Sequence, residues 1–544
     1  MNYKKVLHFS RNRNSLIYSA LSIGIIAVLL GFVIQHNKVP ERVKIKRTLQ
    51  DSCPWLTPSE LSKLIETNNH PSLIKVLRLK HGQFFSKVEI ANIIRNGYYP
   101  TALLLKIPQN ILSEKEQKLF GTFALVRPDE KNEIHLSQLK AFTLEKKPIR
   151  FAYEFYADAL NSYGEQERAK QYYKLEFNKY PESVYSKSKV IISLINKGRK
   201  SEAKALFNDQ KLKENIDFKT FKFIASELEL WMPLTFKSYH LSFSKLSFPW
   251  IIVTLFAALI WFAIIANLGQ LVEGFLIRLT LYGAAFISGF ISTFLVLGLV
   301  YWQENKLGLK INGETVNDII YCICGIGLRE ELIKIIFFAP FLIILKKRQS
   351  AMEALACAAC VGLGFACSEN ILYFGSGFES AVFPRFLTAN FLHTSLTAIV
   401  GLSMYYLILN PVQNWENFFK NFIIVVVAHG AYDALVGIVP NLANSMGIVS
   451  IIIFAIIANS YLNLAKQMRT GKPSALSPLG IFIIGSCLLI GISWNLACYL
   501  YPLKTVFSSI GESTLSLGAL AFIFINQFRD ESVSYTHLTL PTKA

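Results

Sequence analysis

The strongest constraint on this chain is that ionisable side chains stand inside long apolar segments of its second half. A charge at the centre of a membrane costs roughly 2.5 to 3.5 kcal/mol, so such groups face the interior of a helix bundle and mark functional sites. We therefore expect one polar site built from several membrane helices. The ionisable groups fall in four motifs: Glu330-Glu331-x-x-Lys334, Phe365-x-x-x-Glu369-Asn370, His393 and His429-x-x-x-Asp433.

Composition and hydropathy place the chain among polytopic membrane proteins. Its 544 residues are 52% hydrophobic, and several apolar runs exceed the roughly 18 residues that a helix needs to cross a bilayer. The first run lies within residues 1–35 and follows a basic start without a cleavage site, which is typical of a signal anchor. The sequence thus predicts an all-α, polytopic helical membrane protein of about ten spans. The other runs lie near 249–268, 276–303, 318–345, 351–374, 385–409, 418–440, 446–464, 478–501 and 511–527.

The charges of the short loops predict the orientation of these spans. If the N-terminus is cytoplasmic, the basic segments Lys346-Lys347-Arg348 and 466–472 fall in cytoplasmic loops, as the positive-inside rule requires. The opposite loops, 375–384 and 441–445, carry no Lys or Arg. We therefore expect a multi-pass protein of a bacterial cytoplasmic (inner) membrane, with residues 36–248 on the extracytoplasmic side.

Residues 36–248 form a less apolar domain that holds 36 of the 56 Lys and Arg residues and 23 of the 37 Asp and Glu residues. Between 149 and 230, apolar, small and helix-ending residues recur in the manner of paired helices, and this segment resembles tetratricopeptide repeats. Only about two copies are visible, so 55–145 is expected to supply capping helices. The domain is either a concave surface for a peptide partner, with acidic segments or anionic head groups favoured, or a spacer.

Two features are excluded from the predicted site. The pair Cys357-x-x-Cys360 lies among alanines in an apolar span, which favours helix packing over metal or redox chemistry. Cys53 is the one cysteine of the 36–248 domain, so no disulfide can form within it.

The stretch 534–544 (SYTHLTLPTKA) resembles a translated adapter tail, so we interpret it as non-native and assign the membrane domain to 249–530.

The first motif contains two glutamates, one of which could act as a general base. On a helix, Glu330 and Glu331 are both within reach of Lys334, which can neutralise one carboxylate and leave the other free to accept a proton. A structural ion pair between helices is the alternative, but it explains only one of the two glutamates.

The remaining motifs supply acid, amide and imidazole groups. The glycines before Glu369 allow close approach of another helix, and Asn370 can donate to a developing oxyanion. His429 and Asp433 lie one turn apart, which is typical of an imidazole oriented by a carboxylate or of two ligands of one metal. For each of these motifs, the alternative interpretation is that the polar side chains only form contacts between helices. The candidate metal ligands, for a divalent ion such as Zn²⁺, are His393, His429, Glu369 and Asp433, although no H-E-x-x-H spacing is present.

These four motifs, in this order on consecutive spans, resemble the PrsW family of intramembrane proteases over about residues 315–440. The prenyl-protein (CAAX) endopeptidases are similar, but they show E-E-x-x-x-R and F-x-x-x-H, whereas this chain has Lys334, Ile335 and Glu369 at the corresponding places. The resemblance implies cleavage of a membrane-anchored protein, as when family members cut an anti-sigma factor to release a stress response. It implies catalytic roles for Glu330, Glu331, Glu369, His393, His429 and Asp433, supported by Lys334, Phe365 and Asn370.

The predicted function is therefore an intramembrane endopeptidase that works by glutamate or metal chemistry near the outer side of the membrane. The alternative from another class is a non-catalytic receptor or scaffold that presents the repeat domain. A proton-coupled transporter is a third hypothesis, but no inverted repeat is evident. We expect the partners to be a membrane-anchored substrate, a peptide at the repeat domain and the lipid bilayer, with no nucleic acid.

Overall fold

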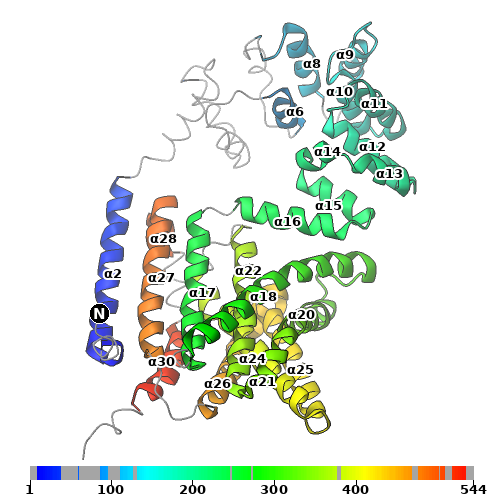
Figure 1. Ribbon diagram of the computed structural model, residues 1–544. Helices are drawn as coiled ribbons and strands as arrows, with labels where there is room; N and C mark the ends of the chain where they lie inside the picture. Colours follow the sequence, from blue (N-terminus) through cyan, green and yellow to red (C-terminus); the bar gives the residue numbers. More distant parts are fainter. Residues whose placement is uncertain are drawn as a thin grey trace, which may run out of the picture. The chain divides into compact units, whose positions relative to one another are not determined.

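The computed structural model describes residues 9–37, 59, 86–95, 109, 111–126, 132–245, 248–270, 274–375, 382–468, 476–501, 503–508 and 518–533. Within these residues the secondary structure is helical and contains no strand, which confirms the predicted all-α fold (Figure 1). Cys53 and the predicted non-native tail, 534–544, lie outside the described residues.

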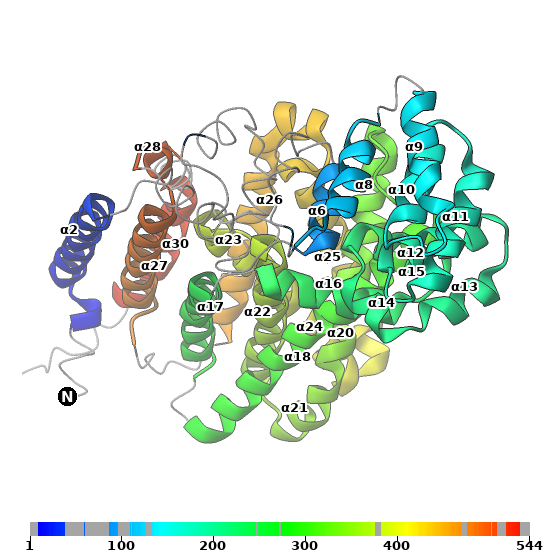
Figure 2. The same cartoon turned by 90° about the horizontal axis from the view of Figure 1, so that it is seen from above.

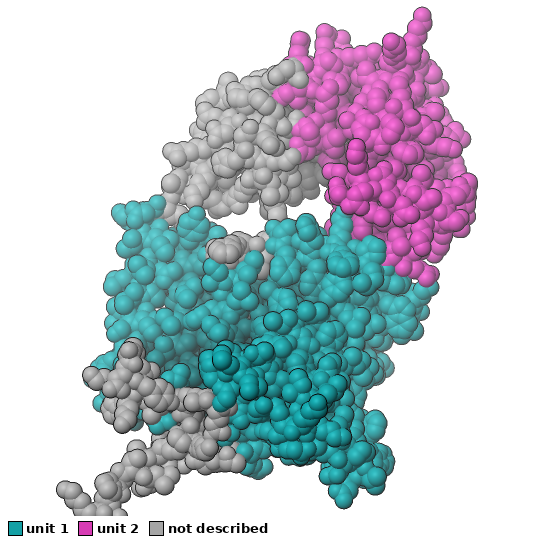
Figure 3. All heavy atoms as spheres, in the orientation of Figure 1, with its two compact units in different colours: residues 1–37, 231–544 teal, residues 38–230 magenta. Residues whose placement is uncertain are grey.

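The chain divides into two compact units (Figure 3). Residues 1–37 and 231–544 form the membrane unit, and residues 38–230 form the repeat unit. The predicted boundary between the two domains lies at residue 248, whereas the membrane unit resumes at Trp231. Helix α16 therefore belongs to the membrane unit. The described helices of the membrane unit are α2 (Arg13–His36), α16 (Trp231–Lys245), α17 (Phe248–Leu268), α18 (Phe275–Trp302), η1 (Gln303–Leu307), α19 (Thr315–Ile320), η2 (Tyr321–Gly327), α20 (Leu328–Phe338), η3 (Ala339–Phe341), α21 (Leu342–Arg348), α22 (Ala351–Gly375), α23 (Val382–Leu387), α24 (Ala389–Leu409), α25 (Pro411–Asp433), η5 (Ala434–Ile438), α26 (Pro440–Gln467), α27 (Pro478–Leu500), α28 (Leu503–Val506) and α30 (Gly518–Val533).

Eight helical segments of the described chain are long and apolar enough to cross a membrane, which confirms a polytopic membrane protein. They coincide with eight of the ten predicted spans. The predicted span 511–527 corresponds to α30, which has 16 residues. The predicted span 318–345 is broken into short pieces from α19 to α21, including the π-helical turn η2. Pro340 lies in η3, where its missing N–H interrupts the helical hydrogen bonds.

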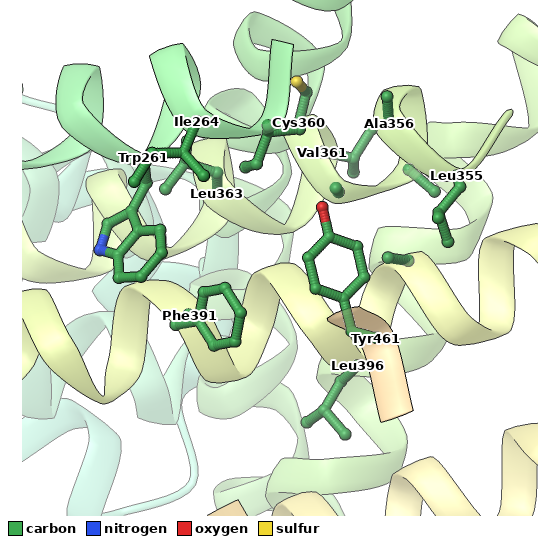
Figure 4. Close-up of a cluster of buried hydrophobic side chains, with 14 of the residues drawn as sticks. Trp261, Ile264, Leu355, Ala356, Cys360, Val361, Leu363, Phe391, Leu396 and Tyr461 are labelled. Carbon is green, nitrogen blue, oxygen red and sulfur yellow. The ribbon is translucent and has the colours of Figure 1, made fainter. Parts of the chain in front are cut away.

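Helix α22 is the centre of the membrane unit, because it packs against α17, α18 and α24 (Figures 1 and 2). Glycines permit this close packing: a Cβ on Gly364 would collide with the carbonyl oxygen of Phe286, and one on Gly362 with that of His393. The close helix approach predicted from these glycines is therefore present. Figure 4 shows the adjoining apolar core, where the rings of Trp261 and Phe391 lie 4.6 Å apart.

The repeat unit consists of short helices packed in sequence. Gly164 and Gly198, 34 positions apart, take left-handed conformations (φ 83° and 74°) between the two helices of a pair, which favours glycine. The predicted helix pairs are thus present, and their assignment to the tetratricopeptide class stays a prediction. The described helices are α6 (Lys87–Arg95), α8 (Glu114–Ala124), α9 (Glu133–Thr143), α10 (Ala152–Ser162), α11 (Gln166–Lys179), α12 (Val184–Asn196), α13 (Lys200–Phe207), α14 (Gln210–Asn215) and α15 (Phe218–Glu227).

Candidate active site

The site begins on α20, whose first turns carry four buried charged side chains, those of Arg329, Glu330, Glu331 and Lys334. Lys334 Nζ donates to Glu331 Oε1 at 2.7 Å and lies 3.7 Å from Glu330 Oε2. Lys334 therefore neutralises Glu331, and Glu330 is the less engaged carboxylate. Glu330 Oε2 is buried and has no hydrogen-bond partner among the described residues.

Close backbone packing brings α25 beside this helix. A Cβ on Gly430 would collide with the backbone of Cys322 and Ile323 in η2, and one on Gly327 with the carbonyl oxygen of Val426. These small residues therefore let His429 reach the carboxylates of α20 from the neighbouring helix.

His429 uses its two ring nitrogens differently. Nδ1 lies 2.7 Å from Glu331 Oε1, where an Nδ1–H donates to the carboxylate. Nε2 lies 3.5 Å from Asp433 Oδ2 and 3.7 Å from Glu330 Oε2. The carboxylate of Glu331 thus orients the imidazole and directs Nε2 towards two other carboxylates.

His393, on α24, links the first motif to the second. Lys334 Nζ lies 2.9 Å from Nδ1, and Glu369 Oε2 lies 3.0 Å from Nε2. Since an ammonium group can only donate, Nδ1 accepts from Lys334 and Nε2–H donates to Glu369. The ammonium also lies 4.2 Å from the ring centre of Phe365, whose ring centre is 5.2 Å from that of His393.

Arg385, on α23, was not among the predicted site residues. Its Nη2 donates to Glu369 Oε2 at 2.9 Å, its Nε donates to Asn370 Oδ1, and Asn370 Nδ2 donates to Asn390 Oδ1 at 2.7 Å. The missed signal was a single arginine at the start of an apolar span, at the edge of a loop region without other basic residues.

The structure therefore brings every predicted site residue into one continuous set of contacts. From α23 this set runs through Glu369, His393, Lys334, Glu331 and His429 to Asp433, with Glu330 beside it. The side chains come from α20, α22, α24 and α25, and their individual roles stay predictions.

Three donor atoms could bind a divalent metal ion, provided that His393 gives up one of its present hydrogen bonds. Glu330, His393 and His429 each offer a ligand atom within 4.8 Å of the others, and all three are buried. His429 Nε2 and Glu330 Oε2 already face this space without a hydrogen bond between them, whereas His393 must release Lys334 or Glu369 to bind a metal. Glu369 and Asp433, predicted as ligands, are not in this group of three.

The formal charge of the cluster agrees with that fit. The carboxylates of Glu330, Glu331, Glu369 and Asp433 stand against the cations Lys334 and Arg385 and the buried Arg329 of α20, so one negative charge is left over when both histidines are neutral. An uncompensated buried charge is costly, and a bound cation would offset it.

A membrane bundle with paired carboxylates and oriented imidazoles at its centre has the chemistry of an intramembrane hydrolase, since these groups can activate water and stabilise an oxyanion. Residues 278–460 match the model of the family described as PrsW family intramembrane metalloprotease. This segment belongs to the PrsW family of intramembrane proteases, and the chain is a peptidase. No curated protein and no solved structure matches the chain.

Proposed function

We propose that this protein is an endopeptidase of a bacterial cytoplasmic membrane that cleaves a membrane-anchored protein near the outer side of the membrane. The observation that carries this proposal is the arrangement around Glu330. Its Oε2 atom is buried without a hydrogen bond and lies 3.7 Å from both His429 Nε2 and Lys334 Nζ. A carboxylate in that position can take a proton from a water molecule, and the adjacent ammonium group of Lys334 stabilises the negative charge that develops.

Each residue has a proposed role that follows from its contacts. Glu330 is the general base, and His393 and His429 stabilise the oxyanion of the tetrahedral intermediate, directly or through a bound metal. Direct contact requires His393 to turn its Nε2–H away from Glu369 and His429 to carry a proton on Nε2. Glu331 holds His429 and Lys334 in place, because one of its oxygen atoms contacts both. Glu369, which lies against His393 and Arg385, binds water or the leaving amine.

Glu330, His393 and His429 would hold the metal, which we propose to be Zn²⁺ or a similar divalent ion. A bound ion of this kind polarises a carbonyl oxygen and lowers the pKa of water. With a metal bound, Glu330 and His429 are ligands, so the role of Glu330 as general base belongs to the metal-free alternative.

The proposed substrate is a single-span membrane protein, with an anti-sigma factor of an extracytoplasmic stress response as the candidate that family resemblance favours. The loop charges support a cytoplasmic N-terminus and an extracytoplasmic repeat unit.

The repeat unit itself offers a pocket of about 740 Å³ for a peptide partner. Charged side chains line it, and Arg150 Nε is a buried donor without a hydrogen bond among the described residues. This supports an acidic peptide as the ligand. The charged and amide side chains around the pocket are those of Arg95, Arg150, Glu154, Glu182, Lys187, Asp209, Lys211 and Asn215.

The test is quantitative proteomics of cells that express wild type or Glu330→Gln at equal levels. Wild type should release extracytoplasmic fragments of at least one single-span protein, and Glu330→Gln should release none. Glu416→Gln is the matched control, because it removes an exposed carboxylate from α25, the helix that carries His429.

Release of the same fragments by Glu330→Gln would contradict the proposal. If wild type also released nothing while the repeat unit alone bound a partner, the scaffold hypothesis would be favoured instead.

A further inference from the structure

A cluster of three hydroxyl groups lies beside the site and is used by none of the motifs. Thr293 Oγ1, on α18, lies 2.6 Å from Ser368 Oγ on α22. Tyr239, on α16, reaches the same point: its hydroxyl hydrogen-bonds to Thr293 and lies 3.3 Å from Ser368 Oγ. Ser368 is fully buried and directly precedes Glu369.

We propose that Tyr239 and Thr293 are positioning residues that fix the rotation of α22 and thereby hold Glu369 against His393. This inference deepens the proposed function and rests on it for its effect on cleavage. Helix α16, which carries Tyr239, is the first helix of the membrane unit after the repeat unit.

The hydroxyl cluster lies where α18 and α22 pack most closely. Gly289 and Gly364 let the two backbones touch, and Thr293 and Ser368 each follow one of these glycines by one helical turn. A carboxylate stands about 6 Å from its helix axis, so a rotation of about 10° moves it by about 1 Å. That displacement is enough to lengthen the 3.0 Å contact between Glu369 and His393 beyond hydrogen-bond range.

Helix α16 is well placed to supply the restraint. Leu234 and Thr235 are fully buried and Ser238 nearly so, and α16 packs against both α18 and α22 (Figure 1). On its outer side, Met232 and Phe236 are exposed.

The same helix provides a matched control. Ser238 Oγ lies 2.7 Å from the hydroxyl of Tyr301, which joins α16 to α18. Tyr301→Phe therefore removes a hydroxyl contact of α16 and leaves Ser368 untouched, whereas Tyr239→Phe removes the contact with Ser368 and keeps the ring.

The experiment measures full-length variants in cells by the rate at which a substrate identified by proteomics is shed. Tyr239→Phe and Thr293→Val should each slow shedding roughly three- to tenfold, the effect of losing one hydrogen bond. Thr293→Ser keeps the hydroxyl and should restore the wild-type rate, and Tyr301→Phe should not change it. An equal loss in Tyr301→Phe, or no rescue by Thr293→Ser, would overturn the proposal.

A second measurement separates this proposal from the proposed function. Hydrogen exchange of residues 365–372 is followed in the full chain in lipid nanodiscs. Tyr239→Phe and Thr293→Val should raise exchange there roughly three- to tenfold, and Thr293→Ser and Tyr301→Phe should not. If wild type cleaves nothing but this pattern is found, only the proposed function fails. If the pattern is missing, the positioning role fails whether or not wild type cleaves.

Discussion

Glu331 Oε1 lies 2.7 Å from Nδ1 of His429, although 98 positions separate the two residues in the chain. The same oxygen atom accepts a hydrogen bond from Lys334. Glu331 therefore fixes both an imidazole and an ammonium group, whereas Oε2 of its neighbour Glu330 has no hydrogen-bond partner among the described residues. Two adjacent glutamates thus have different surroundings and, we expect, different sensitivities to substitution.

Glu331→Gln should lower the stability of the membrane unit by about 3 to 5 kcal/mol, because it leaves the ammonium of Lys334 buried without its closest counter-charge. Glu330→Gln should cost much less, since Glu330 Oε2 makes no hydrogen bond among the described residues. Thermal unfolding of the two purified variants in the same detergent measures the difference. Equal midpoints would contradict the assignment of Glu331 as the residue that fixes both groups.

Arg385→Gln should abolish shedding while the protein stays folded, because Glu369 then loses the cation that lies 2.9 Å away. Arg385→Lys keeps the charge but cannot make both the Glu369 and the Asn370 contacts, so it should retain part of the activity. The shedding rate at matched expression is the measurement. Full activity in Arg385→Gln would mean that the arginine has no part in the reaction.

Metal removal should stop cleavage, and added Zn²⁺ should restore it. Elemental analysis of the purified protein should find about one divalent ion per chain, as a three-ligand site with an open position binds. His429→Ala should lose the ion, whereas Asp433→Asn should keep most of it, since Asp433 is not in the group of three ligands. A protein that stays active after complete removal of metals would favour glutamate chemistry alone.

Gly364→Ala should destabilise the bundle by about 1 to 3 kcal/mol, because its Cβ would collide with the carbonyl oxygen of Phe286. Gly283→Ala is the control on α18, where a Cβ would meet no atom within 4 Å. It should leave the unfolding midpoint unchanged or raise it slightly, because alanine favours the helix. A similar loss of stability in both variants would contradict the collision at Gly364 as the cause.

The repeat unit should lose stability as the pH rises from about 4.5 to about 7. Burial raises the pKa of Glu176 to about 7, and one of its oxygens is buried without a hydrogen bond among the described residues. Its other oxygen accepts the N–H of Phe151 at 2.7 Å. When folding raises the pKa of a carboxyl group, the protonated group stabilises the fold at pH values below the pKa of the unfolded state. This contribution, up to about 3 kcal/mol, is lost as the pH rises to the pKa of the folded state.

Hydrogen exchange of residues 152–179 in the full chain at pH 5 and pH 8 tests this expectation. Wild type should exchange faster at pH 8 after correction for the intrinsic rate. Glu176→Gln should show the same protection at both pH values, and a pH dependence that persists in this variant would assign the effect to another group.

The sequence predicted the helical class and the members of the site because bilayer energetics isolates Glu330, Glu369 and His429 within apolar runs. It did not predict that the span carrying Glu330 is broken. Pro340 was a visible signal for the break at η3, whereas the π-helical turn η2, which packs against α25, has no such signal in the sequence. Arg385 and Tyr239 were missed for a related reason. Neither lies within a motif, and their contacts with α22 arise only when distant helices pack together.

The buried position of α22 also bears on how the enzyme is made. Within its apolar window, 94% of this helix is buried inside the protein, and its partner α24 follows it in the chain. During synthesis, α22 reaches the bilayer before His393 on α24 and His429 on α25 have been translated. With the roles proposed for His393 and His429, the nascent protein cannot cleave, and proteolytic activity begins only when α25 has joined the bundle.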